Sequence, residues 1–115
     1  MNDITIRPWG SYEVLLDTEY CKVKRIIVSP KQRLSYQYHK YRQEAWTIVQ
    51  GVVTVTQNGV DTTYKTGDTI IIGLGDKHRM ANLSETEELI LVEVQTGTYF
   101  GEDDIVRIED DYDRK

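Results

Sequence analysis

The feature that most constrains the fold of this 115-residue chain is that no helical period lasts beyond about one or two turns. Instead, short runs of alternating or β-branched residues follow one another, separated by glycine, proline or asparagine. Asn58-Gly59, between two such runs, is typical of a two-residue hairpin turn. The pattern therefore predicts an all-β chain, with strands at residues 12–16, 20–28, 34–39, 44–50, 52–57, 60–64, 69–72 and 89–95.

Size and composition limit the classes of function. A chain of 115 residues can build one core but not two, and no linker or repeat marks a second unit. Its 14 basic and 19 acidic side chains give a net charge of -5, which argues against broad nucleic-acid binding. No apolar run is long enough to span a membrane, and residues 1–5 lack the features of a signal peptide. Cys21, the single cysteine, cannot form an internal disulfide, so we expect a small buried residue and a cytoplasmic protein.

The two histidines lie among residues suited to metal binding. Gln37 and His39 alternate along a predicted strand, so their side chains share one face of a sheet. Glu44 begins the next strand, and His78 follows a glycine-rich turn. Two imidazoles, a carboxylate and an amide oxygen form a mixed nitrogen and oxygen set that suits zinc or another first-row ion.

The predicted strand at 89–95 has two different faces. Ile90, Val92 and Val94 form one face, and the other carries leucines at its start and then Glu93 and Gln95. A strand that runs from the core of a barrel towards its solvent-exposed opening would show this change from apolar to polar side chains. Glu93 and Gln95 are therefore candidate site residues.

The spacing around the histidines resembles the two motifs of the cupin superfamily. His39 is followed by four residues and Glu44, and then by six residues and Gly51. Gly67 begins the second motif, in which Gly73 replaces the usual proline and His78 is followed by three residues and Asn82. The resemblance implies one cupin domain over residues 1–115, folded as a double-stranded β-helix, a small jelly-roll barrel. Its implied ligands for one divalent metal, zinc before manganese, cobalt, nickel or iron, are Gln37, His39, Glu44 and His78.

Further segments resemble the cupin domain of type II mannose-6-phosphate isomerase, which is usually the C-terminal part of a bifunctional enzyme with a mannose-1-phosphate guanylyltransferase. The resemblance runs from Arg7 to about Arg114 and rests on residues 7–12, 23–26, 34–39, 42–46, 78–79 and 93–105. The chain departs from the family at Lys31, where glycine is usual, and at Lys40 and Tyr41, where histidines are common.

The resemblance implies the interconversion of mannose 6-phosphate and fructose 6-phosphate. This reaction requires a general base, and a metal can stabilise the enediol-like intermediate. We predict Glu93 as the base and Arg79 as a second catalytic residue. Arg42, Lys24 and Gln95 are the predicted substrate-binding residues. For Arg42 and Arg79, the alternative role is to form structural ion pairs.

Other functions remain open. The first alternative is a non-catalytic cupin that binds a sugar or regulates, and the second is a nucleotide-sugar isomerase or epimerase. A metal-dependent oxygenase fits least, because such sites usually have more histidines. We expect a sugar phosphate as ligand, no nucleic acid or membrane partner, and a homodimer. The acidic residues at 102–104 and 109–113 are predicted to be a solvated surface, with a brace for a loop near the site as the alternative for 102–104.

Overall fold

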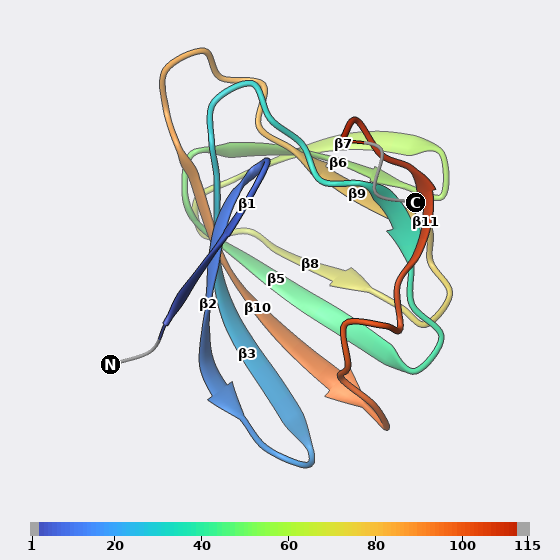
Figure 1. The fold of residues 1–115 in the computed structure, drawn as a ribbon. Coiled ribbons are helices and arrows are strands. Elements are labelled where there is room, and N and C mark those ends of the chain that lie inside the picture. The colour runs from blue at the N-terminus through green and yellow to red at the C-terminus, as the bar shows by residue number, and fades with distance from the viewer. Residues whose placement is uncertain (1–2, 113–115) are drawn as a thin grey trace.

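The computed structural model describes residues 3–112, which form β-strands and no helix (Figure 1). The strands are β1 (Ile4–Arg7), β2 (Gly10–Asp17), β3 (Cys21–Val28), β4 (Tyr36–Tyr38), β5 (Arg42–Gln50), β6 (Val52–Gln57), β7 (Val60–Lys65), β8 (Thr69–Ile72), β9 (His78–Ala81), β10 (Leu89–Gly97) and β11 (Val106–Glu109). They build two antiparallel sheets that face each other. The predicted all-β class is confirmed.

The order of strands brings together segments from both ends of the chain. One sheet has the order β1-β2-β3-β10-β5-β8, and the other has β11-β4-β9-β6-β7. Strand β10 pairs with both β3 and β5, so it holds the centre of the larger sheet. Strands β1 and β11 are edge strands, because each has a neighbour on one side only. In Figure 1 the segment after β10 runs across the open side of the barrel to reach β11.

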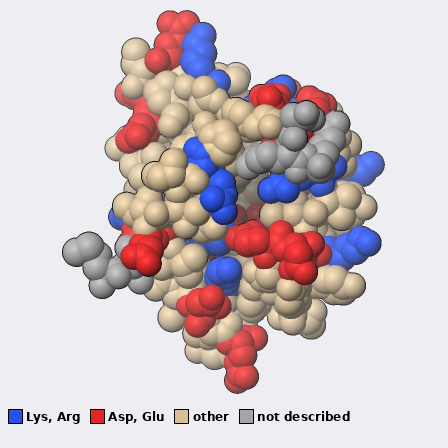
Figure 2. Space-filling view, in the orientation of Figure 1, with Lys and Arg blue, Asp and Glu red and all other residues tan. Residues whose placement is uncertain are grey.

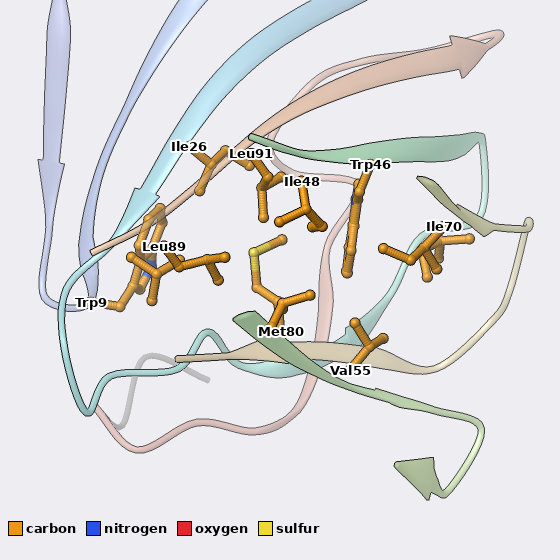
Figure 3. Close-up of a cluster of buried hydrophobic side chains, with 12 residues drawn as sticks. Trp9, Ile26, Trp46, Ile48, Val55, Ile70, Met80, Leu89 and Leu91 are labelled. Atoms are coloured by element: carbon orange, nitrogen blue, oxygen red, sulfur yellow. The ribbon is translucent and has the colours of Figure 1, made fainter. Parts of the chain in front are cut away.

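A hydrophobic core fills the space between the sheets. It comprises Trp9, Ile26, Val28, Trp46, Ile48, Val53, Val55, Ile70, Ile72, Met80, Leu89 and Leu91 (Figure 3). The alternation along β10 explains its contribution: Leu89 and Leu91 are fully buried, whereas Ile90 and Val92 on the other face are only partly buried. Glu93 and Gln95 continue the buried face. Gln95 has no exposed surface, so this face stays buried as far as residue 95.

Most predicted strands and the hairpin agree with the structure. Asn58 and Gly59 have φ angles of 49° and 83°, as the turn between β6 and β7 requires. The prediction missed β1, β9 and β11. Strand β9 was missed because all four of its residues are buried, which removes the alternation that marks a strand.

The predicted strand at 34–39 is shorter in the structure. Residues 36–38 form β4, Leu34 donates its backbone N–H to Met80, and His39 follows the strand. Among residues 3–112 there is no helix long and apolar enough to cross a membrane. Asp113 and Arg114, which belong to the predicted acidic and family segments, lie outside the described residues.

Candidate metal centre

A cavity of about 110 Å³ opens between the two sheets and contains most of the predicted site residues. Its wall is formed by Arg7, Trp9, Tyr12, Lys24, Ile26, Leu34, Ser35, Gln37, Arg42, Glu44, Trp46, His78, Arg79, Met80, Glu93, Glu102, Ile105 and Arg107. Five of these side chains are basic and three are acidic. Figure 2 shows basic and acidic side chains gathered around a recess near the middle of this face.

Backbone carbonyl groups orient both imidazoles in the same way. His39 Nδ1 lies 2.7 Å from the carbonyl oxygen of Asp104, and His78 Nδ1 lies 2.8 Å from that of Asp76. A carbonyl oxygen only accepts hydrogen bonds, so each Nδ1 carries the proton and each Nε2 keeps a lone pair. Burial, as the largest effect, lowers the pKa of His78 and favours its neutral form. Both rings are thereby prepared to bind a metal through Nε2.

The carboxylate of Glu44 lies between the two histidines. Its Oε2 is 3.1 Å from His39 Nε2, and its Oε1 is 3.9 Å from His78 Nε2. Burial alone would raise the pKa of Glu44, but the positive charge of either histidine when that ring is protonated, and the charge of Arg42, lower it well below its usual range. The Trp46 indole N–H donates to Oε1 at 2.9 Å and fixes the carboxylate in place. Glu44 is therefore a charged, preoriented ligand.

Gln37 completes the predicted ligand set. Its Nε2 lies 3.3 Å from His39 Nε2, and its Oε1 accepts a hydrogen bond from Ser35 at 2.5 Å. Because the Ser35 hydroxyl can also accept a hydrogen bond, a half turn of the amide would present the oxygen to a metal and keep the Ser35 contact. The structure thus brings all four predicted ligands together.

These side chains fit a divalent metal. One ligand atom each from His39, Glu44 and His78 lies within 4.8 Å of the others, and all three side chains are buried. His78 Nε2 is buried without a hydrogen-bond partner among the described residues. Lone pairs that converge in this way repel one another unless a cation lies between them. The donor set matches the prediction.

Glu93 lies on the wall of the same cavity. It is fully buried on β10, and burial followed by the charge of Glu44 raises its pKa to about 7, despite the opposing effect of Lys24 and Arg42. The Gln95 amide donates a hydrogen bond to Glu93 Oε1. A carboxyl with a pKa near neutrality can accept and release a proton under ordinary conditions. This property favours Glu93 as the base predicted from the sequence.

Two of the predicted substrate-binding cations already have acidic partners. Lys24 forms an ion pair with Glu102, and its Nζ lies 4.3 Å from the centre of the Tyr12 ring. Arg42 Nε donates to Glu44 Oε2 at 2.9 Å, while its Nη1 is buried without a hydrogen-bond partner in the described part of the chain. Arg42 Nη2 is 3.4 Å from His39 Nε2, so this guanidinium lies directly beside the ligand set.

Arg79 and Gln95 are placed differently from the other predicted residues. Arg79 lines the cavity, yet its guanidinium donates to the carbonyl oxygen of Leu34 at 2.8 Å and to Glu109 at 3.2 Å. These contacts hold β11 against the barrel, which favours the structural ion pair over a catalytic role. Gln95 does not reach the cavity wall formed by the described residues and contacts Glu93 instead. The catalytic role of Arg79 and the substrate role of Gln95 stay predictions.

The sequence prediction missed Asp104 as a site residue, although it named residues 102–104 as a possible brace. The Asp104 side chain is buried, and its carboxylate oxygens accept hydrogen bonds from the backbone N–H groups of Lys40 and Tyr41, each at 3.0 Å. Its carbonyl oxygen orients His39. The acidic triplet was a signal for this role, but its partners are more than sixty positions away in the chain.

Comparison with known proteins agrees with this geometry. The family model described as the C-terminal domain of mannose-6-phosphate isomerase matches residues 1–110. The chain belongs to this family. The predicted resemblance is therefore confirmed, and it covers nearly the whole sequence.

Family members from bacteria include parts of longer proteins. The chain is 43% identical to the xanthan biosynthesis protein XanB of Xanthomonas campestris over 108 residues, which is 94% of this chain and 23% of that protein. It is also 43% identical to the mannose-1-phosphate guanylyltransferase ManC of Salmonella typhimurium, with coverage of 94% and 22%. The alginate biosynthesis protein AlgA of Pseudomonas aeruginosa is 41% identical, with the same coverage. The chain spans about a quarter of the length of these relatives.

Solved structures confirm the cupin fold. A protein with a double-stranded β-helix domain from Klebsiella pneumoniae has a TM-score of 0.73 and 30% identity, covering 84% of this chain and 76% of that one. The capsular polysaccharide assembling protein CapF of Staphylococcus aureus has a TM-score of 0.80 at 17% identity, covering 95% and 33%. The second likeness shows the fold alone.

Proposed function

We propose that this cupin domain is a metal-dependent sugar-phosphate isomerase that interconverts mannose 6-phosphate and fructose 6-phosphate. The observation that carries the proposal is Glu93, a buried carboxyl with a pKa of about 7 on the wall of the cavity that Gln37, Glu44 and His78 also line. An aldose-ketose isomerase needs a base next to a site that stabilises charge on oxygen. Membership of the mannose-6-phosphate isomerase family supports the choice of sugar.

The chain's residues divide the chemistry between them. Gln37, His39, Glu44 and His78 would hold the divalent ion, which when bound supplies Lewis-acid stabilisation of the developing negative charge. Glu93 removes the proton from C2 of the aldose and returns it to C1, while the proton of the C2 hydroxyl passes to the oxygen on C1, which gives the ketose. A carboxyl with a pKa near neutrality suits this task because it must both take up and release the proton.

Arg42, which lies beside the ligand set, supports the same step. Its guanidinium is buried and lies within 3.4 Å of His39 Nε2, and one of its nitrogens has no hydrogen-bond partner in the described residues. A substrate hydroxyl or carbonyl oxygen in the cavity would accept this free hydrogen bond. The exclusion of water from the buried site strengthens the interaction.

A coupled assay tests the proposal. The purified chain is analysed for bound metal, and fructose 6-phosphate formation from mannose 6-phosphate is followed with and without a chelator. We expect turnover that the chelator abolishes and that zinc, manganese or cobalt restores. No turnover by the metal-loaded chain, with sugar-phosphate binding retained, would instead support the non-catalytic sugar-binding cupin.

The cellular setting is a separate proposal. XanB and AlgA are named as xanthan and alginate biosynthesis proteins, and we infer a similar place for this chain in polysaccharide precursor synthesis. We further propose a cytoplasmic homodimer without nucleic-acid or membrane partners. Sedimentation of the purified chain as a monomer at micromolar concentration would contradict the dimer.

A further inference from the structure

The basic side chains around the cavity differ in whether an acidic side chain already neutralises them. Lys24 pairs with Glu102, Arg42 with Glu44, and Arg79 with Glu109. The remaining two, Arg7 and Arg107, form no ion pair with any residue in the described range 3–112. An anionic ligand gains most from cations whose charge is not already compensated.

Arg107 is directed into the cavity by its place in the sheet. On β11 it lies opposite Gln37 of β4, and residues opposite each other on neighbouring strands project to the same face. Gln37 belongs to the ligand set, and both residues line the cavity. The Nε atom of Arg107 is buried yet has no hydrogen-bond partner among the described residues. A buried guanidinium nitrogen without a protein partner is available to donate a hydrogen bond to a ligand.

Arg7 reaches the cavity from the other sheet. It ends β1, and Tyr12 supports its guanidinium, whose central carbon is 5.3 Å from the centre of the Tyr12 ring. Its hydrogen bonds go to two uncharged oxygens, the Tyr12 hydroxyl at 3.4 Å and the Ile6 carbonyl at 3.2 Å. Arg7 and Arg107 therefore approach from one edge strand of each sheet, β1 and β11.

A hexose 6-phosphate is long enough that its phosphate and its reacting carbons need different cations. Arg42 lies against Glu44 and His39, where C1 and C2 must be placed for proton transfer. The phosphate on C6 is at the opposite end of the carbon chain, whose bonds are about 1.5 Å each. Arg42 is thus too close to the ligand set to bind that phosphate, and the cation that does so must lie elsewhere on the wall.

We propose that Arg7 and Arg107 form the subsite for a terminal phosphate dianion, and that Lys24 and Arg42 act at the reacting end of the sugar. This inference rests on the proposed function for the position of C1 and C2. Two guanidinium groups from opposite edges clamp the phosphate with charge-assisted hydrogen bonds. The subsite selects phosphorylated over free sugars.

Calorimetric titration of the metal-loaded chain with inorganic phosphate, mannose 6-phosphate and mannose tests the subsite. We expect Arg7→Gln and Arg107→Gln each to weaken phosphate and mannose 6-phosphate binding by about 10- to 100-fold, as expected for loss of a charged hydrogen-bond partner. Binding of mannose should stay the same. Arg107→Lys, which keeps the charge, should recover part of the affinity.

Control variants separate this subsite from general charge effects. Arg25→Gln removes an equal charge at a residue that pairs with Glu13 and does not line the cavity, so it should bind phosphate as the parent chain does. Melting curves show whether each variant is folded. Unchanged phosphate affinity in folded Arg7 and Arg107 variants, loss only in Lys24→Met, or no phosphate binding by the parent chain would overturn the proposal. Phosphate binding without isomerase turnover would retain the subsite and remove only the proposed activity.

Discussion

At the scale of single residues, the site depends on the direction of lone pairs. Two backbone carbonyls hold the protons of His39 and His78 away from the cavity, and the Glu44 carboxylate lies between the free nitrogens. Such carbonyl partners are what metal-binding histidines need, because they fix both the tautomer and the ring plane. Glu93 is affected by the same site: burial and the nearby charge of Glu44 raise its pKa.

Removing a ligand should empty the metal site. We expect Glu44→Gln and His78→Ala to lower the metal content measured by elemental analysis, since each loses a buried ligand atom. Glu85→Gln is a matched control, because Glu85 is exposed and its one ion pair within residues 3–112 is with the exposed Lys31. Unchanged metal stoichiometry in both ligand variants would contradict the site.

Activity should rise with pH as Glu93 loses its proton. With a pKa of about 7 in the free chain, its base form becomes dominant above neutrality, so kcat/KM should increase through that range. Glu93→Gln should reduce kcat by about 10²- to 10⁴-fold, as expected for loss of a general base. Turnover by Glu93→Gln equal to that of the parent chain would assign the base to another group.

Stability should change with pH in the opposite direction. The pKa of Glu93 is about 7 in the folded chain against an ordinary value of 4.5, so the folded state holds this proton more tightly than the unfolded state. Its contribution is complete below the ordinary value and is lost as the pH rises through about 7. Urea unfolding of the metal-free chain should show this decrease, and Glu93→Gln should lack it.

At the scale of elements, the segment between β10 and β11 fixes the turn that carries His39. Asp104 accepts two backbone hydrogen bonds from the turn and one from the His39 ring. Gly97, at the end of β10, permits the close approach of the same turn: a Cβ there would lie 2.3 Å from the Tyr41 carbonyl oxygen. Two residues that are distant from His39 in the sequence therefore determine the position of its side chain.

Loss of the Asp104 carboxylate should loosen this ligand. We expect Asp104→Ala to weaken zinc affinity by about 10- to 100-fold in a competition titration, as changes to groups that support metal ligands usually do. Asp103→Ala is the neighbouring control, since Asp103 contacts only the exposed side chain of Tyr99 among the hydrogen bonds found in residues 3–112. Equal zinc affinities for the two variants would show that the turn is held by other contacts.

Replacing Gly97 should destabilise the fold. Gly97 has a φ angle of 142°, and a Cβ would meet both the Tyr41 carbonyl oxygen and Arg42 Cα, so Gly97→Ala should lose about 2 kcal/mol or more of unfolding free energy. Gly59→Ala keeps the strain of a positive φ but meets no atom within 4 Å. It should cost only about 1 kcal/mol. Denaturant unfolding of both variants measures the difference.

At the scale of the whole molecule, the cavity exists because two sheets close around polar residues at one end of the core. Apolar residues fill the space between the sheets elsewhere (Figure 3). His39, Glu44, His78 and Glu93 are buried as well. Such buried charges are costly unless they are paired or bind a metal. Metal binding should therefore stabilise the folded chain.

Chelation should lower the melting temperature of the chain. A metal that binds only the folded state, at a concentration of 100 times its Kd, adds about 2.7 kcal/mol to the free energy of unfolding. Melting curves with zinc and with a chelator should therefore differ for the parent chain and coincide for His78→Ala. Coincident curves for the parent chain would contradict a link between metal binding and folding.

The sequence predicted what depends on local pattern. Alternation and turn residues were enough for the hairpin at Asn58-Gly59 and for the inward face of β10 from Leu89 to Glu93. The spacing of Gln37, His39, Glu44 and His78 predicted a common site, which the structure brings together. These features are visible in sequence because strand geometry fixes the side of the sheet on which each residue lies.

Only the tertiary structure decided which groups meet across the barrel. The partners of Asp104 and Arg79 lie far along the chain, and the free charge of Arg107 follows from the pairing of the last strand with β4. Sequence pattern reports the period of a strand, but the order of strands and the distance between charges arise when the sheets close. Residue types and spacing thus determined an all-β chain with a mixed-ligand site, whereas tertiary packing determined the pKa of Glu93 and which cations stay free for an anion.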